Sequence, residues 1–130
     1  MNFVLDTSAF SRFTDSSIKT TDLDAFFNLE NTIYIPLIVV AELRAGYKCG
    51  SRYSENEATL QRFLDSPNVT ILYPTDTTAS MYANIYAELR RLGKPIGVND
   101  MWIAALCFEH NLPLLTTDKD FARIPGLPLA

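Results

Sequence analysis

The sequence predicts an α/β domain in which helices flank a mostly parallel β-sheet. Short apolar runs rich in β-branched and aromatic residues alternate along the chain with longer segments of helical periodicity, which is the pattern of a parallel sheet. The chain has 130 residues, of which 48% are hydrophobic and 20% are charged, so it can bury one sizeable core. We therefore expect a single domain that spans residues 1–130.

The chain is expected to open with a strand followed by a helix. Residues 2–6, NFVLD, predict a buried strand because Phe, Val and Leu dominate this short run. Thr7 and Ser8 are both of residue types that cap helices, so a helix is expected to begin near Ala9. Leucine and phenylalanine at helical spacing then predict a helical face over residues 21–29.

The middle of the chain repeats this alternation. A second strand is predicted over residues 31–35, NTIYI, and it ends at Pro36. Proline is favourable at a first helical position, so the next helix is expected to start there and to reach about Tyr47. Apolar residues at helical spacing predict another helix over residues 54–65. Residues 69–73, VTILY, predict the third strand.

The last third of the chain holds the longest predicted helix. Residues 76–92 carry apolar side chains at intervals of three and four, and a glycine follows them. A further helix is predicted over residues 100–110. A short fourth strand is predicted over residues 112–117, LPLLTT, and leads into a helical turn over residues 118–121. The final segment GLPLA, residues 126–130, predicts a short fifth strand.

Composition excludes several classes of function. The single histidine and the two cysteines, Cys49 and Cys107, cannot fill a closed four-ligand zinc site. A cytosolic chain is expected to keep both thiols reduced. Neither GxxxxGK[ST] nor GxGxxG occurs, so ATPases and dinucleotide-dependent enzymes lose their main sequence support.

Net charge and hydropathy limit the kinds of partner and the cellular location that we expect for this chain. The net charge of −4 argues against a broad basic surface for nucleic acid, but setting aside four of the 15 acids leaves 11 to balance the 11 basic residues. The longest apolar run, residues 33–41, is much shorter than the about 20 residues of a membrane span. No basic segment precedes the opening apolar run, as one would in a secretory signal. We therefore expect a cytoplasmic protein without a membrane partner.

Four carboxylates stand where an α/β domain places ligands. Asp6 ends the first predicted strand and Asp118 follows the fourth, and parallel sheets bind ligands at the carboxyl ends of their strands. Glu42 lies inside the apolar stretch IVVAEL, and Asp100 begins the helix NDMWIAAL. Carboxylates brought together repel one another unless a cation joins them, and Mg²⁺ or Mn²⁺ suits an all-oxygen site. The four acids therefore predict one metal site able to support phosphoryl transfer.

Each acid also has an ordinary structural interpretation. Asp6 suits a strand-to-helix turn, Asp100 suits the first turn of a helix, and Asp118 suits the cap of a short helix. A buried Glu42 would be satisfied by an ion pair. The residues alone leave both interpretations open.

Four segments resemble those of PIN-domain ribonucleases, and more closely the VapC toxins of bacterial toxin–antitoxin pairs. They are LDTS, VVAELRAG, NDMWIAA and TTDKDF, in this order, and the resemblance runs from Asp6 to the final IPGL. It implies a PIN-like three-layer domain and metal-dependent hydrolysis of RNA phosphodiester bonds. By matched position it implies Asp6, Asp100 and Asp118 as ligands of Mg²⁺, for which Mn²⁺ can substitute. Glu42 completes the implied catalytic set and helps to position the nucleophile.

The same resemblance implies partners. These are a VapB-type antitoxin, an RNA substrate such as a specific structured transfer RNA, and a second copy of the chain in a homodimer. It further implies a larger toxin–antitoxin complex that binds operator DNA through the antitoxin.

Several other residues have roles that the sequence leaves open. Thr116 matches a position of the family that is rich in Ser and Thr, and Asp120 suits either the site or the start of a short helix. Arg44, Lys48 and Arg52 recur every four residues and share one helical stripe if the helix continues that far. This stripe suits the rim of an RNA groove or a solvated face.

A second basic cluster, His110 and several aromatic residues also have more than one interpretation. Arg90, Arg91 and Lys94 suit either phosphate contacts or the C-terminus of a helix. His110 is expected to favour the C-terminus of its helix. Aromatic residues at helical spacing are expected to pack in the core or between subunits in preference to stacking on bases: Phe26, Phe27, Tyr82, Tyr86 and Trp102.

Three other interpretations compete with a nuclease. A non-catalytic PIN-like module would act only through a protein partner, although degenerate members usually lose one or more acids and all four are present here. A phosphatase of the haloacid-dehalogenase pattern has a second Asp two residues after the first, where this chain has Ser8. A receiver-like domain needs an acidic pair that is missing and a late lysine, for which Lys119 is only an approximate candidate.

Overall fold

Four strands form a sheet in which all neighbours are parallel. The computed structural model describes residues 1–14 and 30–130. Within these ranges the sheet order is β3-β2-β1-β4, with β1 at Asn2–Leu5, β2 at Thr32–Pro36, β3 at Val69–Leu72 and β4 at Leu114–Leu115. Val4 fixes the register of the central strand, because it pairs with Tyr34 of β2 and with Leu114 of β4.

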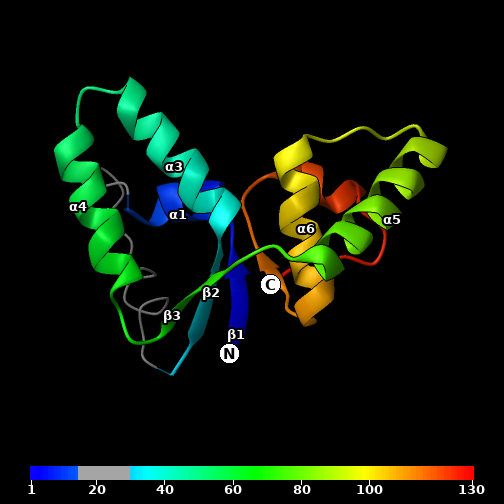
Figure 1. Ribbon diagram of the computed structural model, residues 1–130, viewed down its shortest axis with the longest axis horizontal. Helices are drawn as coiled ribbons and strands as arrows, with labels where there is room; N and C mark the ends of the chain where they lie inside the picture. Colours follow the sequence, from blue (N-terminus) through cyan, green and yellow to red (C-terminus); the bar gives the residue numbers. More distant parts are fainter. Residues whose placement is uncertain (15–29) are drawn as a thin grey trace.

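Helices flank this sheet, as the sequence predicts. They are α1 (Thr7–Thr14), α3 (Leu37–Cys49), α4 (Tyr53–Leu64), α5 (Asp76–Leu92) and α6 (Val98–His110), and a 3₁₀ helix η1 follows at Lys119–Arg123. Figure 1 shows α3 and α4 on one side of the sheet and α5 and α6 on the other. The predicted α/β class, a parallel sheet with flanking helices, is confirmed. Among the helices described, none has the length and apolarity needed to cross a membrane.

The core is built around β1 and α6. Phe3 and Val4 of β1 are fully buried and Leu5 is nearly so, which fits a central strand covered on both faces. From Ile103 to Cys107 every residue of α6 is buried. The carboxyl end of β1 therefore emerges from the buried core, and the side chain that follows it has a rigid support.

Several helix starts differ from the predictions. Helix α1 begins at Thr7, because the Asp6 carboxylate accepts a hydrogen bond from the backbone N–H of Ala9 at 2.9 Å and so caps the helix itself. Pro36 ends β2 and occupies the N-cap position of α3, one residue before the predicted first helical position. Helix α6 begins at Val98, two residues earlier than predicted, which places Asp100 inside its first turn.

The predicted fifth strand is wrong. Its segment makes only an isolated bridge between Leu129 and Leu114, with backbone N–H to O distances of 2.8 Å from Leu114 to Pro128 and from Ala130 to Leu114. Pro128 has no N–H to donate, so a ladder cannot extend through it. The fourth strand is also shorter than predicted, only two residues. The helical face predicted over residues 21–29 lies outside the described residues.

Candidate active site

The carboxylate of Asp6 is held by several hydrogen bonds at the carboxyl end of β1. Asp6 is only 3% exposed. The Ser8 hydroxyl lies 2.9 and 3.0 Å from its two oxygens, and the Thr116 hydroxyl donates to Oδ2 at 2.6 Å. The backbone N–H of Ala9 donates to Oδ1 at 2.9 Å. A buried carboxylate with this many donors has one fixed orientation.

The same hydroxyl groups join α1 to the segment that follows β4. Thr116 Oγ1 accepts a hydrogen bond from the backbone N–H of Asp118 at 3.0 Å, and Ser8 Oγ accepts one from the backbone N–H of Thr117 at 3.1 Å. The two hydroxyls also lie 3.3 Å apart. Two segments more than a hundred residues apart in sequence are thereby fixed around Asp6. Thr116, whose role the sequence leaves open, is a direct partner of that carboxylate.

Glu42 lies on α3 and is partly buried, and its partner is a hydroxyl group. Thr7 Oγ1 donates a hydrogen bond to Glu42 Oε1 at 2.8 Å. Within the described residues no salt bridge involves Glu42, so the ion pair offered as its structural alternative is not observed there. Sequence reasoning missed Thr7 as a partner of Glu42. No local pattern reveals a bond between residues 35 positions apart.

The charges of the other three predicted acids all affect the pKa of Asp100. Burial, together with the negative charges of neighbouring carboxylates, raises the pKa of Asp100 to about 6. In order of decreasing effect these carboxylates are Asp118, Glu42, Asp6 and Asp120. A hollow of about 310 Å³ lies between α3 and the start of α6, lined by residues 97–100 and Glu42. The structure thus brings the four predicted acids, and Asp120, into one region. We call Asp6, Glu42, Asp100 and Asp118 the acidic cluster.

Asp118 combines this position with its ordinary structural role. Its Oδ1 accepts a hydrogen bond from the backbone N–H of Asp120 at 2.9 Å, so Asp118 is the N-cap of η1. Asp120 forms an ion pair with Arg123, with 3.4 Å between Oδ1 and Nη2. Asp118 therefore caps a helix while its charge raises the pKa of Asp100, whereas Asp120 has a cationic partner of its own.

The donor chemistry of the acidic cluster fits a hard divalent cation. All four side chains offer carboxylate oxygens, and their mutual repulsion is the electrostatic condition that Mg²⁺ or Mn²⁺ relieves. Within residues 1–14 and 30–130, no three His, Cys, Asp or Glu side chains converge closely enough to enclose an ion. Mg²⁺ usually keeps several waters and takes only one or two carboxylates directly, so it does not require three converging side chains.

The cysteines take no part in this site. Cys49 is exposed and Cys107 is buried, and both thiols are free. Burial, with a smaller contribution from Asp6, raises the pKa of Cys107 to about 12. Its thiol therefore stays protonated at neutral pH and is a poor metal ligand.

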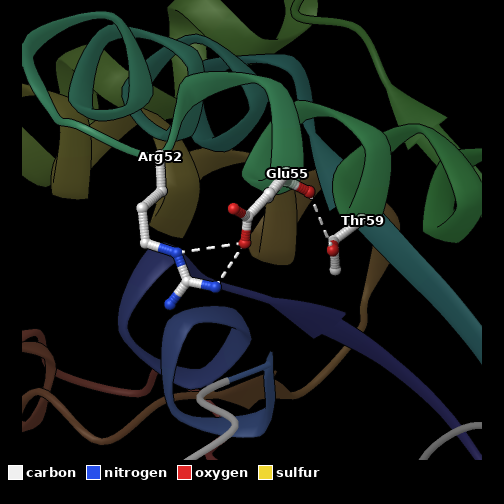
Figure 2. Close-up of polar contacts among 3 residues, drawn as sticks. All are labelled: Arg52, Glu55 and Thr59. Carbon is white, nitrogen blue, oxygen red and sulfur yellow. Dashed lines mark hydrogen bonds and ion pairs between the residues drawn. The ribbon is translucent and has the colours of Figure 1, made fainter.

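The basic stripe predicted along the third helix does not continue. Helix α3 ends at Cys49, so Arg52 lies beyond it and contacts the carboxylate of Glu55, with Nε 3.1 Å from Oε2 (Figure 2). The Thr59 hydroxyl in the same view donates to the backbone oxygen of Glu55 at 3.1 Å. The other two cations are also engaged within the α3–α4 pair. Arg44 contacts Glu57 at 2.9 Å, and Lys48 lies 4.1 Å from the centre of the Tyr53 ring.

The aromatic residues of α5 and α6 pack against one another. The Tyr82 ring stacks on Trp102 with 4.7 Å between centroids, and Tyr86 lies 6.4 Å from Tyr82 at an interplanar angle of 24°. Phe26 and Phe27 lie outside the described residues. His110 is the last residue of α6, as predicted, with Nε2 3.7 Å from the carboxylate of Glu109.

Known proteins resemble this chain over almost its whole length. The family model described as PIN domain matches residues 3–127. "Ribonuclease VapC5" of Mycobacterium tuberculosis is 31% identical, with 95% of this chain and 87% of that protein covered. "Ribonuclease VapC2" of Rickettsia felis is 33% identical, with 99% and 96% covered.

Solved structures agree with these sequence matches. VapBC2 from Rickettsia felis, bound to a DNA fragment from its promoter, has a chain that superposes with a TM-score of 0.84 at 28% identity, covering 100% of this chain and 98% of that one. A chain of VapBC-1 from nontypeable Haemophilus influenzae also gives a TM-score of 0.84, at 26% identity, covering 100% and 97%.

Proposed function

Because the chain belongs to the PIN domain family, we propose that it is the toxin of a type II toxin–antitoxin pair and acts as a Mg²⁺-dependent endoribonuclease. The observation that carries the proposal is the acidic cluster. Carboxylates from four separate segments of the sequence lie in one region beside the carboxyl end of β1, where burial and the charges of the other three raise the pKa of Asp100. Relatives of similar length that bear the name ribonuclease support the same activity.

The proposed ligands of the metal are Asp6, Asp100 and Asp118, directly or through water, with Mn²⁺ able to replace Mg²⁺. When bound, the cation supplies Lewis acidity and lowers the pKa of a water molecule. The protein supplies orientation: Ser8, Thr116 and the Ala9 N–H hold the Asp6 carboxylate in one position. Glu42, held by Thr7, accepts a hydrogen bond from the attacking water and directs it toward phosphorus.

The proposed partners follow from the solved relatives. Those relatives are VapBC assemblies, and one is bound to promoter DNA. We infer that this chain binds a VapB-type antitoxin, forms a homodimer, and joins a larger complex that binds operator DNA through the antitoxin. Its place of action is the cytoplasm. The proposed substrate is a specific structured RNA such as a transfer RNA, which rests on the family resemblance.

Cleavage of total cellular RNA by purified, antitoxin-free protein tests this function. We expect cleavage with Mg²⁺ or Mn²⁺, none with EDTA, and a loss of at least about 100-fold in Asp6→Asn, because removing one group from a preorganised electrostatic site costs about this much. Asp65→Asn is the matched control, since Asp65 is an exposed carboxylate at the end of α4.

Two results would contradict the proposal. Cleavage by Asp6→Asn at the parent rate would remove Asp6 from the site. Absence of cleavage by folded protein loaded with metal, over RNA from several growth conditions, would favour the alternative of a non-catalytic PIN-like module that acts through a protein partner.

A further inference from the structure

We propose that a pocket beside the acidic cluster is a subsite for one nucleotide of the RNA strand, next to the phosphodiester bond that is cut. Its phosphate would contact Arg90 and Lys94, and its base would stack on Tyr86. The inference rests on the proposed function and extends it to how the strand is held.

The pocket lies between the end of α5 and the start of α6. Its volume is about 320 Å³, within the range of sites that hold small ligands. The apolar floor comes from Leu89, Ile96 and Met101, and the rim carries Tyr86, Arg90 and Lys94. An apolar floor with a polar, cationic rim is the arrangement that a nucleotide needs, because its base is flat and largely apolar on its faces and its phosphate is anionic.

One short stretch of chain separates this pocket from the acidic cluster. Residues 93–96 and Met101 line the nucleotide pocket, whereas residues 97–100 line the hollow that also contains Glu42. Asp100 and Met101 are adjacent in sequence but belong to different hollows. A strand whose scissile phosphate lies at the acidic cluster therefore has this pocket immediately beside it.

The backbone that carries the two cations is well fixed. Gly93 ends α5 in the left-handed conformation, at φ 66°. The backbone N–H of Gly93 donates to the backbone oxygen of Arg90 at 3.2 Å, and the backbone N–H of Lys94 donates to the backbone oxygen of Leu89 at 3.0 Å. On the far side of the loop, Arg123 Nη1 donates to the backbone oxygen of Pro95 at 3.2 Å. The backbone of the rim thus needs little ordering when a ligand binds.

Charge complementarity favours a phosphate as the occupant. In the part of the chain that the structure describes, neither Arg90 nor Lys94 forms a salt bridge, whereas the neighbouring Arg91 is paired with Glu88 at 2.7 Å. Two exposed cations beside a negatively charged site repel a second pair of cations, so a symmetric contact between two copies of this rim is unfavourable. The phosphates of an RNA strand are negatively charged and therefore complement the positive charges of Arg90 and Lys94.

The aromatic residues supply a surface for the base. Trp102, Tyr82 and Tyr86 form a row of stacked rings that runs from α6 across α5. Tyr86 ends this row at the pocket and is 46% exposed. A base stacked on Tyr86 continues the row, and such stacking does not depend on which base is present.

Binding of single-stranded RNA oligonucleotides to an Asp6→Asn background in Mg²⁺, followed by fluorescence anisotropy over a salt series, tests the subsite. Arg90→Gln with Lys94→Gln should lower the slope of log affinity against log salt by about 0.7, because both cations contact the same phosphate. Tyr86→Ala should weaken binding by about 5- to 100-fold, and Tyr86→Phe should restore it. Arg91→Gln is the matched control, and it should leave both the affinity and the slope unchanged.

The outcomes separate this inference from the proposed function. If the parent protein cleaves RNA but the Arg90, Lys94 and Tyr86 variants bind with parental affinity and slope, the subsite is wrong and the nuclease stands. If these variants instead change the sedimentation of the protein without changing RNA binding, the pocket is an interface between copies. If the parent protein neither binds nor cleaves RNA, both proposals fail.

Discussion

Single residues in this molecule serve structure and site at the same time. Asp6 caps α1 through the Ala9 N–H and also belongs to the acidic cluster, and Asp118 caps η1 while its charge raises the pKa of Asp100. The structural interpretation of these two acids is therefore confirmed, and their positions are compatible with the proposed metal site. Capping fixes a carboxylate on a rigid backbone group, which is what a preorganised site requires.

Thr7→Val should lower the rate of RNA cleavage while leaving the fold intact. The change keeps the shape of the side chain and removes the hydroxyl that donates to Glu42 Oε1. Residues that orient a site carboxylate commonly contribute about 10- to 100-fold, so we expect a loss in this range, measured as kcat/KM on a defined RNA. Thr7→Ser retains the hydroxyl and should restore most of the rate.

A merely structural role for Thr7 would give a different pattern. Thr7→Val and Thr7→Ser would then differ in melting temperature, and their cleavage rates would follow their stability. Equal rates for Thr7→Val and the parent would show that Glu42 does not need this hydrogen bond.

At the scale of elements, most carboxylates of the acidic cluster lie at helix ends and not in helix interiors. The Schellman-type end of α5 at Gly93 sets the course of the loop that reaches α6, and Asp100 stands in the first turn of α6. Sequence patterns predict the existence and type of these helices well because apolar spacing and the glycine are local signals. Patterns place their first residues less well, because Asp6 and Pro36 become caps only through the surrounding geometry.

The same substitution at two glycines should change stability in opposite directions. Gly93→Ala forces alanine into φ 66°, although no heavy atom lies within 4 Å of its added Cβ. The penalty is therefore conformational, about 1 kcal/mol or somewhat more. Gly46→Ala lies inside α3, also with nothing within 4 Å, and should stabilise the protein by about 0.5–1 kcal/mol.

Urea unfolding of both variants measures this difference directly as a change in midpoint at constant slope. Gly93→Asn serves as a control because asparagine tolerates the left-handed region, so its loss should be smaller than that of Gly93→Ala. A stabilising Gly93→Ala would mean that α5 does not end in the left-handed turn.

At the scale of the whole molecule, the parallel sheet brings carboxylates from distant parts of the sequence into one region. The order β3-β2-β1-β4 places β1 at the centre, so the segments after β1 and β4 meet beside α3 and the start of α6. The position of the acids at strand ends was predictable, since it follows from a general property of parallel sheets. Three other features were not predictable, because each depends on long-range geometry or on where a helix stops. They are the hydrogen bond from Thr7 to Glu42, the ion pair of Arg52 with Glu55, and the absence of the fifth strand.

The concentration of negative charge at one end of the sheet predicts how pH and Mg²⁺ act on stability. The pKa of Asp100 is raised from 3.8 to about 6, so the folded protein prefers the protonated carboxyl. The stability that this preference contributes is complete below about pH 4 and is lost as the pH rises through about 6. Without metal, Asp100→Asn should therefore melt above the parent at pH 8, and the difference should disappear near pH 4. Asp65→Asn, which removes an exposed charge at the end of α4, is the control variant measured over the same pH series.

Mg²⁺ should reverse this loss in the parent protein, because a cation that binds only the folded state stabilises it by mass action. At about 100 times the Kd this adds about 2.7 kcal/mol, which corresponds to a rise in Tm of roughly 10 °C for a chain of this size. The rise should be larger at pH 8 than at pH 5, because protons compete with the metal for Asp100, and it should be smaller in Asp100→Asn at both pH values. Differential scanning calorimetry with Mg²⁺ and with EDTA measures all four cases. An equal rise at both pH values, or an undiminished rise in Asp100→Asn, would place the cation away from Asp100 and leave the acidic cluster as a source of repulsion that the fold tolerates without a metal.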